Sequence, residues 1–110
     1  MRDFEKLIWR DSLMLVDFFA GWCGPCRMMY PIIEQFEKEM RGRVEVYKVD
    51  IDNREMADVI HRYNIVSVPT LIFFRRGEIL WRESGCIPYE RLCHVFHEIE
   101  QCEPVTPYYF

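Results

Sequence analysis

The stretch AGWCGPCR, at residues 20–27, joins an apolar run that ends at Phe19 to a segment with the pattern of a helix. Its two cysteines, Cys23 and Cys26, are three positions apart. The N-terminal end of a helix carries partial positive charge and free N–H groups, which favour a thiolate over a thiol. A thiolate with a second thiol one helical turn away is the minimal arrangement for exchanging disulfides. We therefore expect thiol–disulfide chemistry where the strand meets the helix.

Apolar runs and helical patterns alternate along the chain and predict a layered α/β protein. Strands are expected at residues 13–19, 44–50, 71–74 and 79–82, and the last two form a hairpin that turns near Gly77. Helices are expected from Asp3 past Ile8, from Cys23 to Met40, from Asn53 past Tyr63, and from Pro88 onward. The cysteine motif therefore lies between the first strand and the second helix.

The bulk properties predict one domain. With 110 residues, half of them hydrophobic, the chain can fill a single core without disulfide staples. We assign residues 1–102 to this domain and residues 103–110 to a C-terminal tail. The net charge of −4, with both signs interspersed, argues against a nucleic-acid-binding surface, which needs clustered Lys and Arg. No apolar run is long enough to cross a membrane, and the first residues lack a signal-peptide pattern, so the cytoplasm is the default expectation.

Cys23 is the candidate nucleophile and Cys26 the candidate resolving thiol. The thiolate attacks a target disulfide, and the second thiol then attacks the mixed disulfide and frees the reduced target. A structural disulfide and half of a zinc site are the alternative interpretations of the same spacing. Zinc needs four ligands, whereas the sequence has no second CxxC and its three His, at positions 61, 94 and 97, fall in other expected helices.

Asp17 lies inside the apolar strand just before the motif. A carboxylate is unfavourable to bury, so we expect the pKa of Asp17 to be raised. The alternative is an Asp at the end of a strand that faces solvent. Its apolar neighbours on both sides favour burial.

Beyond the cysteine motif, several further segments resemble the thioredoxin family, in the same order along the chain. They are LVDF at 15–18, Pro31 in the following helix, VYKVDID at 46–52, SVPT at 67–70, and FFRRGE at 73–78 followed by Gly85. The resemblance covers roughly residues 4–101 and implies the thioredoxin fold, a mixed sheet flanked by about four helices. Most members carry one more strand before the first helix. It is missing here, so we expect about four strands, with the strand at 44–50 on an edge.

The resemblance also implies roles for residues around the cysteines. Asp17 would take up and return the proton of Cys26, and Lys48 would be its partner, although a plain surface lysine is the alternative. Gly24 and Pro25, between the cysteines, resemble the dipeptide of the reducing members. Oxidising relatives usually carry a His there.

A shallow groove for a peptide is implied beside the motif. The family has a cis peptide bond before the residue that matches Pro69, which would turn the Val68 backbone toward a peptide that pairs like an added strand. A proline that merely begins a strand is the alternative. Trp22, Pro25, Ile51, Ser67 and Gly85 would complete the groove. Ser84 stands where many thioredoxins have an apolar residue, and this changes part of the rim of the groove.

Three cysteines lie outside the motif. Free cysteines are most often small buried hydrophobes. We expect Cys102 to be buried and Cys93 to lie at the flank of its helix. Cys86 follows Gly85 and is expected on the groove rim near Cys23, so it has a functional interpretation beside the plain one.

The expected function is the reduction of protein disulfides by a Cys23/Cys26 cycle, with no bound cofactor and no metal. The resemblance implies an NADPH-dependent, flavin-containing thioredoxin reductase as electron donor. It also implies oxidised protein substrates such as peroxiredoxins, methionine sulfoxide reductases or ribonucleotide reductase. We expect a monomer. The alternatives are a thiol oxidant or isomerase in an oxidising compartment, and a non-catalytic subunit that binds peptides in the groove.

Overall fold

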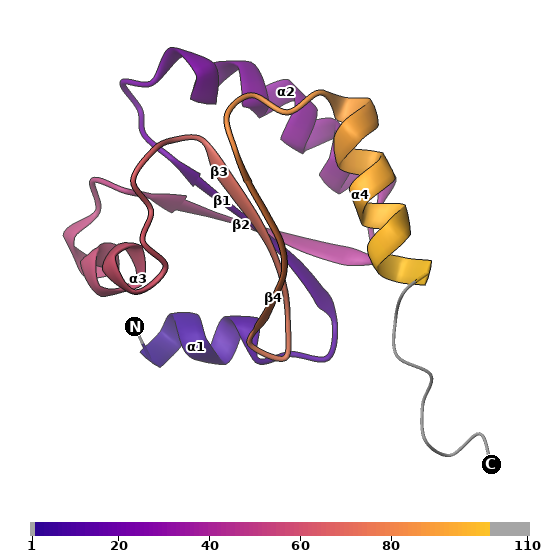
Figure 1. Cartoon of the computed structure of the whole chain (residues 1–110), viewed down its shortest axis with the longest axis horizontal. Helices are drawn as coiled ribbons and strands as arrows, with labels where there is room; N and C mark the ends of the chain where they lie inside the picture. Colours follow the sequence, from indigo (N-terminus) through magenta and orange to yellow (C-terminus); the bar gives the residue numbers. More distant parts are fainter. Residues whose placement is uncertain (1, 102–110) are drawn as a thin grey trace.

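The computed structural model describes residues 2–101; the predictions for Cys102 and for the tail at 103–110 lie outside this range. The strands are β1 (Leu13–Phe19), β2 (Val44–Asp50), β3 (Thr70–Arg75) and β4 (Glu78–Ser84). The helices are α1 (Arg2–Ile8), α2 (Gly24–Glu39), α3 (Ala57–Arg62) and α4 (Tyr89–Gln101), with a short 3₁₀ helix η1 (Arg54–Met56) before α3. The four strands form one mixed sheet in the order β2-β1-β3-β4 (Figure 1).

Helices cover both faces of this sheet. Helices α2 and α4 pack on one face and α1 and α3 on the other (Figure 1). The alternation of β1 separates the two cores, because Leu13 and Leu15 point to the α2 and α4 side, and Met14 and Val16 to the α1 and α3 side. Asp17 therefore shares the face of Leu15, below α2.

Strand β2 is an edge of the sheet, as predicted. Within residues 2–101 it pairs only with β1, in parallel, and the exposed residues along it are Glu45, Tyr47 and Lys48. Two charged residues and a tyrosine are typical of a sheet edge that stays in water. Arg10, in the loop after α1, forms an ion pair with Glu45 at 2.8 Å and covers part of this edge.

The ends of the elements follow local chemistry. The Asn53 side chain accepts a hydrogen bond from the Glu55 N–H at 3.0 Å, as expected of a cap, but the first turn that it caps is 3₁₀ and the α-helix begins only at Ala57. The hairpin strands are longer than their apolar cores predicted, because Thr70 and Ser84 also pair through their backbones. Apolar periodicity does not detect such polar strand ends.

The hairpin turn is fixed by a contact with the segment after α1. Gly77 has a φ of +79°, a conformation that suits glycine, and its N–H donates to the Ile8 carbonyl at 2.9 Å. The exposed ring of Trp9 lies directly over Gly77, so closely that a Cβ there would approach the ring to 2.6 Å. The first helix is thus joined to the far end of the sheet from the cysteines (Figure 1).

Candidate active site

The two motif cysteines lie where β1 ends and α2 begins. Cys23 is the N-cap residue of α2, and its Sγ accepts a hydrogen bond from the Cys26 backbone N–H at 3.2 Å. Both side chains are buried, with Cys23 5% and Cys26 3% exposed. A sulfur at this position receives a helix N–H and the positive end of the helix dipole, which stabilise negative charge on it.

Cys26 is held as a thiol. Burial, and next the side-chain hydrogen bond with Cys23, raise the pKa of Cys26 well above its ordinary value; the nearby negative charge of Asp17 raises it further. Cys26 is therefore inactive as a nucleophile at neutral pH until a base takes its proton. The structure thus supports different roles for the two sulfurs.

Asp17 is the buried carboxyl that the sequence predicted. It is 2% exposed, and its Oδ1 atom has no hydrogen-bond partner among residues 2–101. Burial raises the pKa of Asp17 to about 6, although the positive charge of Lys48 lowers it in part. An acid with this pKa can accept and return a proton near neutral pH.

Lys48 lies opposite Asp17 in the β1–β2 ladder. Its ammonium group, however, is placed over the ring of Tyr30, 4.7 Å from the ring centre, and within the described part of the chain it makes no ion pair with the carboxylate. The structure thus brings the predicted partners together as neighbouring charges rather than as a hydrogen-bonded pair. Tyr30 was not anticipated, because the contact joins α2 to a separate strand.

The predicted peptide groove surrounds the cysteines. The Val68–Pro69 bond is cis, and the Val68 carbonyl accepts from Cys23 Sγ at 3.6 Å. Gly85 is tied to this loop, since its N–H donates to the Pro69 carbonyl at 2.9 Å. Ser67 and Gly85 are exposed and Ile51 half-buried, so these predicted residues are available at the surface.

Trp22 and Ser84 have partners that the sequence did not indicate. Trp22 is 69% exposed, and its Nε1–H donates to Asp52 at 2.9 Å, which holds the indole beside the motif. The Ser84 hydroxyl lies 2.7 Å from that of Thr70, which donates in turn to the Ser67 carbonyl. The serine that alters the rim therefore braces the loop before Pro69.

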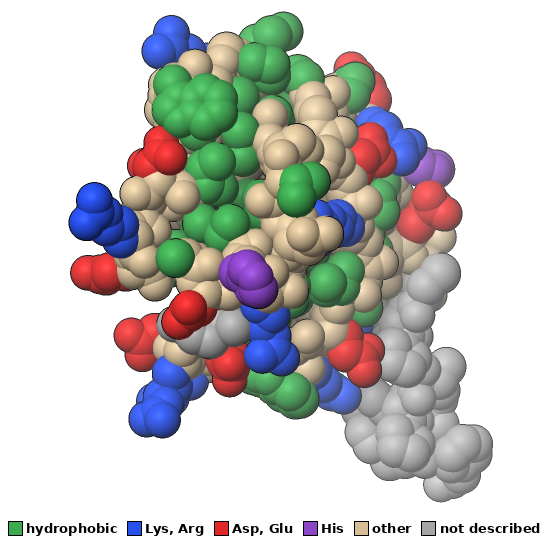
Figure 2. All heavy atoms as spheres, turned by 60° about the vertical axis from the view of Figure 1, so that its left-hand side comes forward, with side chains coloured by type: hydrophobic (Ala, Val, Ile, Leu, Met, Phe, Trp, Pro, Cys, Tyr) green, Lys and Arg blue, Asp and Glu red, His purple; other side chains and the backbone are tan. Residues whose placement is uncertain are grey.

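Hydrophobic side chains gather around this site. Figure 2 shows them in the upper part of the face, over the start of α2, with charged groups more frequent below. Val66, in the loop before Pro69, is 82% exposed, and Met28, in α2, is 63% exposed. Neither was among the predicted groove residues. Exposed apolar side chains around a reactive group are typical of a surface that receives other proteins.

The other cysteines differ in exposure. Cys86 is exposed and follows Gly85, while Cys93 is half-buried at the flank of the α4 core, as expected. Within residues 2–101, no group of three His, Cys, Asp or Glu side chains is placed to hold a metal ion. None of the helices in the same range is long and apolar enough to cross a membrane.

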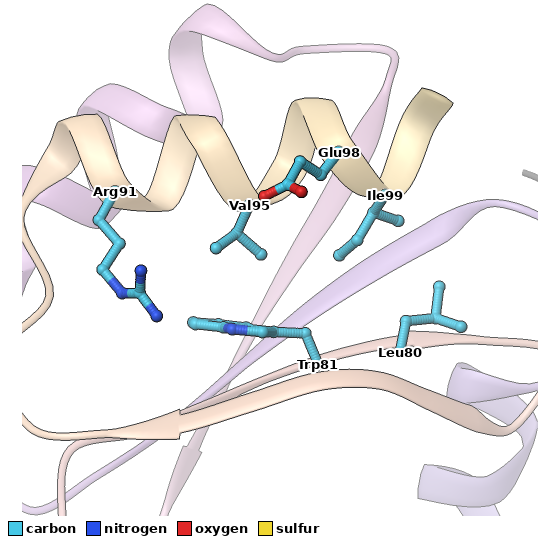
Figure 3. Close-up of a pocket in the computed structure, with 6 residues that line it drawn as sticks. All are labelled: Leu80, Trp81, Arg91, Val95, Glu98 and Ile99. Atoms are coloured by element: carbon cyan, nitrogen blue, oxygen red, sulfur yellow. The ribbon is translucent and has the colours of Figure 1, made fainter. Parts of the chain in front are cut away.

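A separate cleft of about 400 Å³ lies between β4 and α4. It is lined by Leu80, Trp81, Arg91, Val95, Glu98 and Ile99 (Figure 3). The guanidinium of Arg91 donates hydrogen bonds to the Glu83 carboxylate, so its charge is already paired within the protein. Neither motif cysteine lines this cleft, and the chemistry belongs to the other site.

The fold and site define a class of protein. A thiol pair at a helix N-terminus, next to a buried carboxyl and a cis-proline loop, on a mixed sheet covered by helices, is the apparatus of a thiol–disulfide exchange protein. The two thiols can supply the two electrons that reduce a disulfide.

Comparison with known proteins gives the family. The thioredoxin family model matches residues 1–98. The thioredoxin of Alicyclobacillus acidocaldarius is 40% identical over 90 residues, which are 82% of this chain and 84% of that protein. Thioredoxin 1 of Chlorobaculum tepidum is 38% identical over 72% of this chain and 76% of that protein. The chain belongs to the thioredoxin family of thiol–disulfide oxidoreductases and is a protein-disulfide reductase.

Two further similarities extend the comparison. Chloroplastic thioredoxin M4 of Arabidopsis thaliana is 42% identical over 79% of this chain, which spans only 44% of that protein. The crystal structure of thioredoxin from Trypanosoma brucei brucei has a TM-score of 0.83 and 27% identity, and the match covers 92% of this chain and 86% of that one. The predicted thioredoxin fold is confirmed. Relatives include chloroplastic proteins as well as bacterial ones, so the family alone does not assign a compartment.

Proposed function

We propose that the chain reduces partner disulfides with Cys23 as nucleophile, Cys26 as resolving thiol and Asp17 as proton acceptor. The observation that carries this proposal is the placement of the Cys23 sulfur as the N-cap of α2, hydrogen-bonded to the Cys26 N–H. One sulfur lies where a helix N–H and the helix dipole favour negative charge, and the other is held as a thiol close to a buried carboxyl. This asymmetry is what a two-step exchange requires.

Two thiol–disulfide exchange steps transfer two electrons and two protons to the target. The Cys23 thiolate attacks one sulfur of the target; the target S–S bond breaks, and its other sulfur leaves as a thiolate that takes a proton from water. Asp17 then accepts the proton of Cys26, whose sulfur attacks Cys23. The mixed disulfide breaks, and the target's remaining sulfur leaves as a thiolate that takes up a proton. The Cys23–Cys26 disulfide forms, and two electrons have passed to the target.

The residues around the sulfurs support binding of an extended peptide segment. The Val68 carbonyl faces Cys23, and a segment lying along residues 67–69 would pair with this backbone. Trp22, Ile51 and Gly85 border the segment, Gly24 and Pro25 shape the turn between the sulfurs, and Cys86 lies at the rim. No cofactor is needed in this scheme, since the thiols carry the electrons.

The electron donor in this proposal is an NADPH-dependent thioredoxin reductase, and the substrates are oxidised proteins. We place the protein in a compartment that keeps thiols reduced, with the cytoplasm as the first choice. Purified reductase with NADPH tests the donor directly, because NADPH oxidation then depends on this chain and on an oxidised substrate such as insulin. Cell fractionation tests the compartment.

Trapping tests the roles of the sulfurs. A Cys26→Ser variant should accumulate mixed disulfides with oxidised proteins, because resolution is blocked, whereas Cys23→Ser should trap none. Cys93→Ser, at a half-buried cysteine beside the α4 core, is the matched control and should turn over normally. Trapping by Cys23→Ser and not by Cys26→Ser would reverse the assignment.

The reduction potential separates a reductase from an oxidant. A Cys23/Cys26 potential near about −270 mV is expected of a reductase of this kind, and a value near about −120 mV would indicate a thiol oxidant. A protein that binds targets but keeps its function in the Cys26→Ser variant would be a non-catalytic subunit.

A further inference from the structure

Tyr30 is close to the reaction site, but it touches neither sulfur in the mechanism above. It lies four residues after Cys26 in α2, on the neighbouring turn of the same helix face. Its ring is 39% exposed and its centre lies 6.3 Å from that of Phe19, at the end of β1. On its other side is the ammonium group of Lys48, 4.7 Å from the ring centre. The ring thus lies between the end of β1 and the edge strand β2.

Lys48 is placed to reach Asp17 but does not do so. The two residues are direct neighbours in a parallel ladder, so their side chains leave the same face of the sheet from strands about 4.8 Å apart. A lysine side chain is long enough to bridge that spacing. Nevertheless the buried Asp17 Oδ1 has no hydrogen-bond partner, and the ammonium is stacked on the Tyr30 ring.

We propose that Tyr30 is a positioning residue: its ring binds the Lys48 ammonium and keeps it out of ion-pair distance of the Asp17 carboxyl. The attraction between a cation and an aromatic face competes here with the attraction between the cation and a carboxylate. The importance of this for catalysis rests on the proton-acceptor role proposed above for Asp17.

The consequence is chemical. A directly paired lysine would stabilise the carboxylate and lower its pKa by about 1–3 units. With the lysine diverted, burial dominates and the pKa of Asp17 stays at about 6. An acid near the working pH is the more effective proton carrier, because it must both accept and return the proton of Cys26.

Few charges act on Asp17 from the elements packed against it. Lys48 approaches from β2, and the thiol of Cys26 approaches from the start of α2. From β3 the ladder neighbour is Leu71, which carries no charge. Lys48 is therefore the cation whose position decides the state of the carboxyl.

Two substitutions of Tyr30 distinguish binding of Lys48 by the aromatic ring from mere shielding of the site by an apolar side chain. Tyr30→Phe keeps the ring and should leave the pKa of Asp17 unchanged. Tyr30→Leu keeps an apolar side chain over the site but removes the aromatic face, so Lys48 is released toward Asp17. We expect the pKa of Asp17 to fall by about one unit in this variant. The pKa is read from the ¹³C carboxyl shift of Asp17 across pH 4–9 in the reduced protein.

The Lys48→Met background is the decisive control. With the ammonium gone, Tyr30→Leu has nothing to release, so the double variant should have the same Asp17 pKa as Lys48→Met alone, and both should exceed the wild-type value. An equal fall in the two backgrounds would show that Tyr30 acts only by excluding water. No fall in the Tyr30→Leu variant, or a rise, would also overturn the proposal.

The experiment does not depend on turnover. The Asp17 titration is measured without substrate, so it stands even if the trapping experiment refutes the assigned roles of the cysteines. If both proposals hold, the acid limb of the pH profile of disulfide reduction should shift down with the Asp17 pKa in Tyr30→Leu and stay in place in Tyr30→Phe. The ring is at the surface, and the thermal unfolding of each variant gives the check on folding.

Discussion

The Sγ atom of Cys23 accepts a hydrogen bond from the Cys26 N–H at 3.2 Å, so the two members of the thiol pair are linked by the helix backbone itself. Because Cys23 is the N-cap residue, the same bond both starts α2 and stabilises charge on the sulfur. Structure and reactivity therefore depend on the same contact.

Alkylation of the reduced protein should distinguish the two thiols. Iodoacetamide near pH 7 should modify Cys23 much faster than Cys26. Burial and the hydrogen bond with Cys23 raise the pKa of Cys26 and leave it a thiol. The modified residue is identified by peptide mass spectrometry after short exposure. Faster labelling of Cys26 would contradict the assigned roles.

Asp17→Asn should stabilise the protein at neutral pH while slowing turnover. The folded-state pKa of Asp17 is about 6 against an ordinary value of 3.8, so folding favours its protonated form. The wild type therefore loses stability as pH rises from about 4 to above 6, by about 3 kcal/mol for this group. An amide does not titrate, so the variant lacks this loss, but it cannot accept the proton of Cys26.

Urea unfolding at pH 4 and pH 7.5 measures the effect. The gap in unfolding free energy between Asp17→Asn and wild type should be larger at pH 7.5 than at pH 4. A gap that does not change with pH would mean that the carboxyl is not buried as described. Unchanged reduction rates across pH 6–9 would exclude the proton role.

Gly77→Ala should destabilise the fold for two separable reasons. Gly77 has a φ of +79°, and an added Cβ would approach the Trp9 ring to 2.6 Å. Gly42 has a φ of +87° with no atom within 4 Å of such a Cβ. Gly42→Ala should therefore show the backbone effect alone, about 1–2 kcal/mol, and Gly77→Ala a larger loss.

Denaturant midpoints in two backgrounds test this. Introduced together with Trp9→Ala, Gly77→Ala should lose no more than Gly42→Ala does. If Gly77→Ala lowers the stability equally with Trp9 present and with Trp9→Ala, the Trp9 ring moves aside without an energetic penalty and does not fix the hairpin.

The edge strand should leave the protein a monomer. Strand β2 carries Glu45 and Lys48 on its exposed positions, and charges at an edge oppose pairing with a second strand. Light scattering over a range of concentrations, with reductant present, should give the mass of one chain. A dimer that persists in reductant and dissociates on Val46→Pro would show instead that the edge is an interface.

The sequence by itself determined the order of strands and helices and the position of the thiol pair. These follow from local patterns: the apolar run before Cys23, the N-cap position and the hairpin around Gly77 each depend on residues close together in the chain. The burial of Asp17 was predicted in the same way, from its apolar neighbours. The resemblance to a known family supplied the cis bond at Pro69 and, through the strand that is missing before the first helix, the open edge at β2.

Only the tertiary structure decided which partners the polar side chains of the site take. Lys48 contacts Tyr30 rather than Asp17, the Trp22 indole donates to Asp52, and the Ser84 hydroxyl meets that of Thr70. Each pair joins residues more than ten positions apart on separate elements, so it depends on how those elements pack. Several acceptors compete for one cation or donor, and the packing of the elements decides which of them it reaches, which no local pattern encodes.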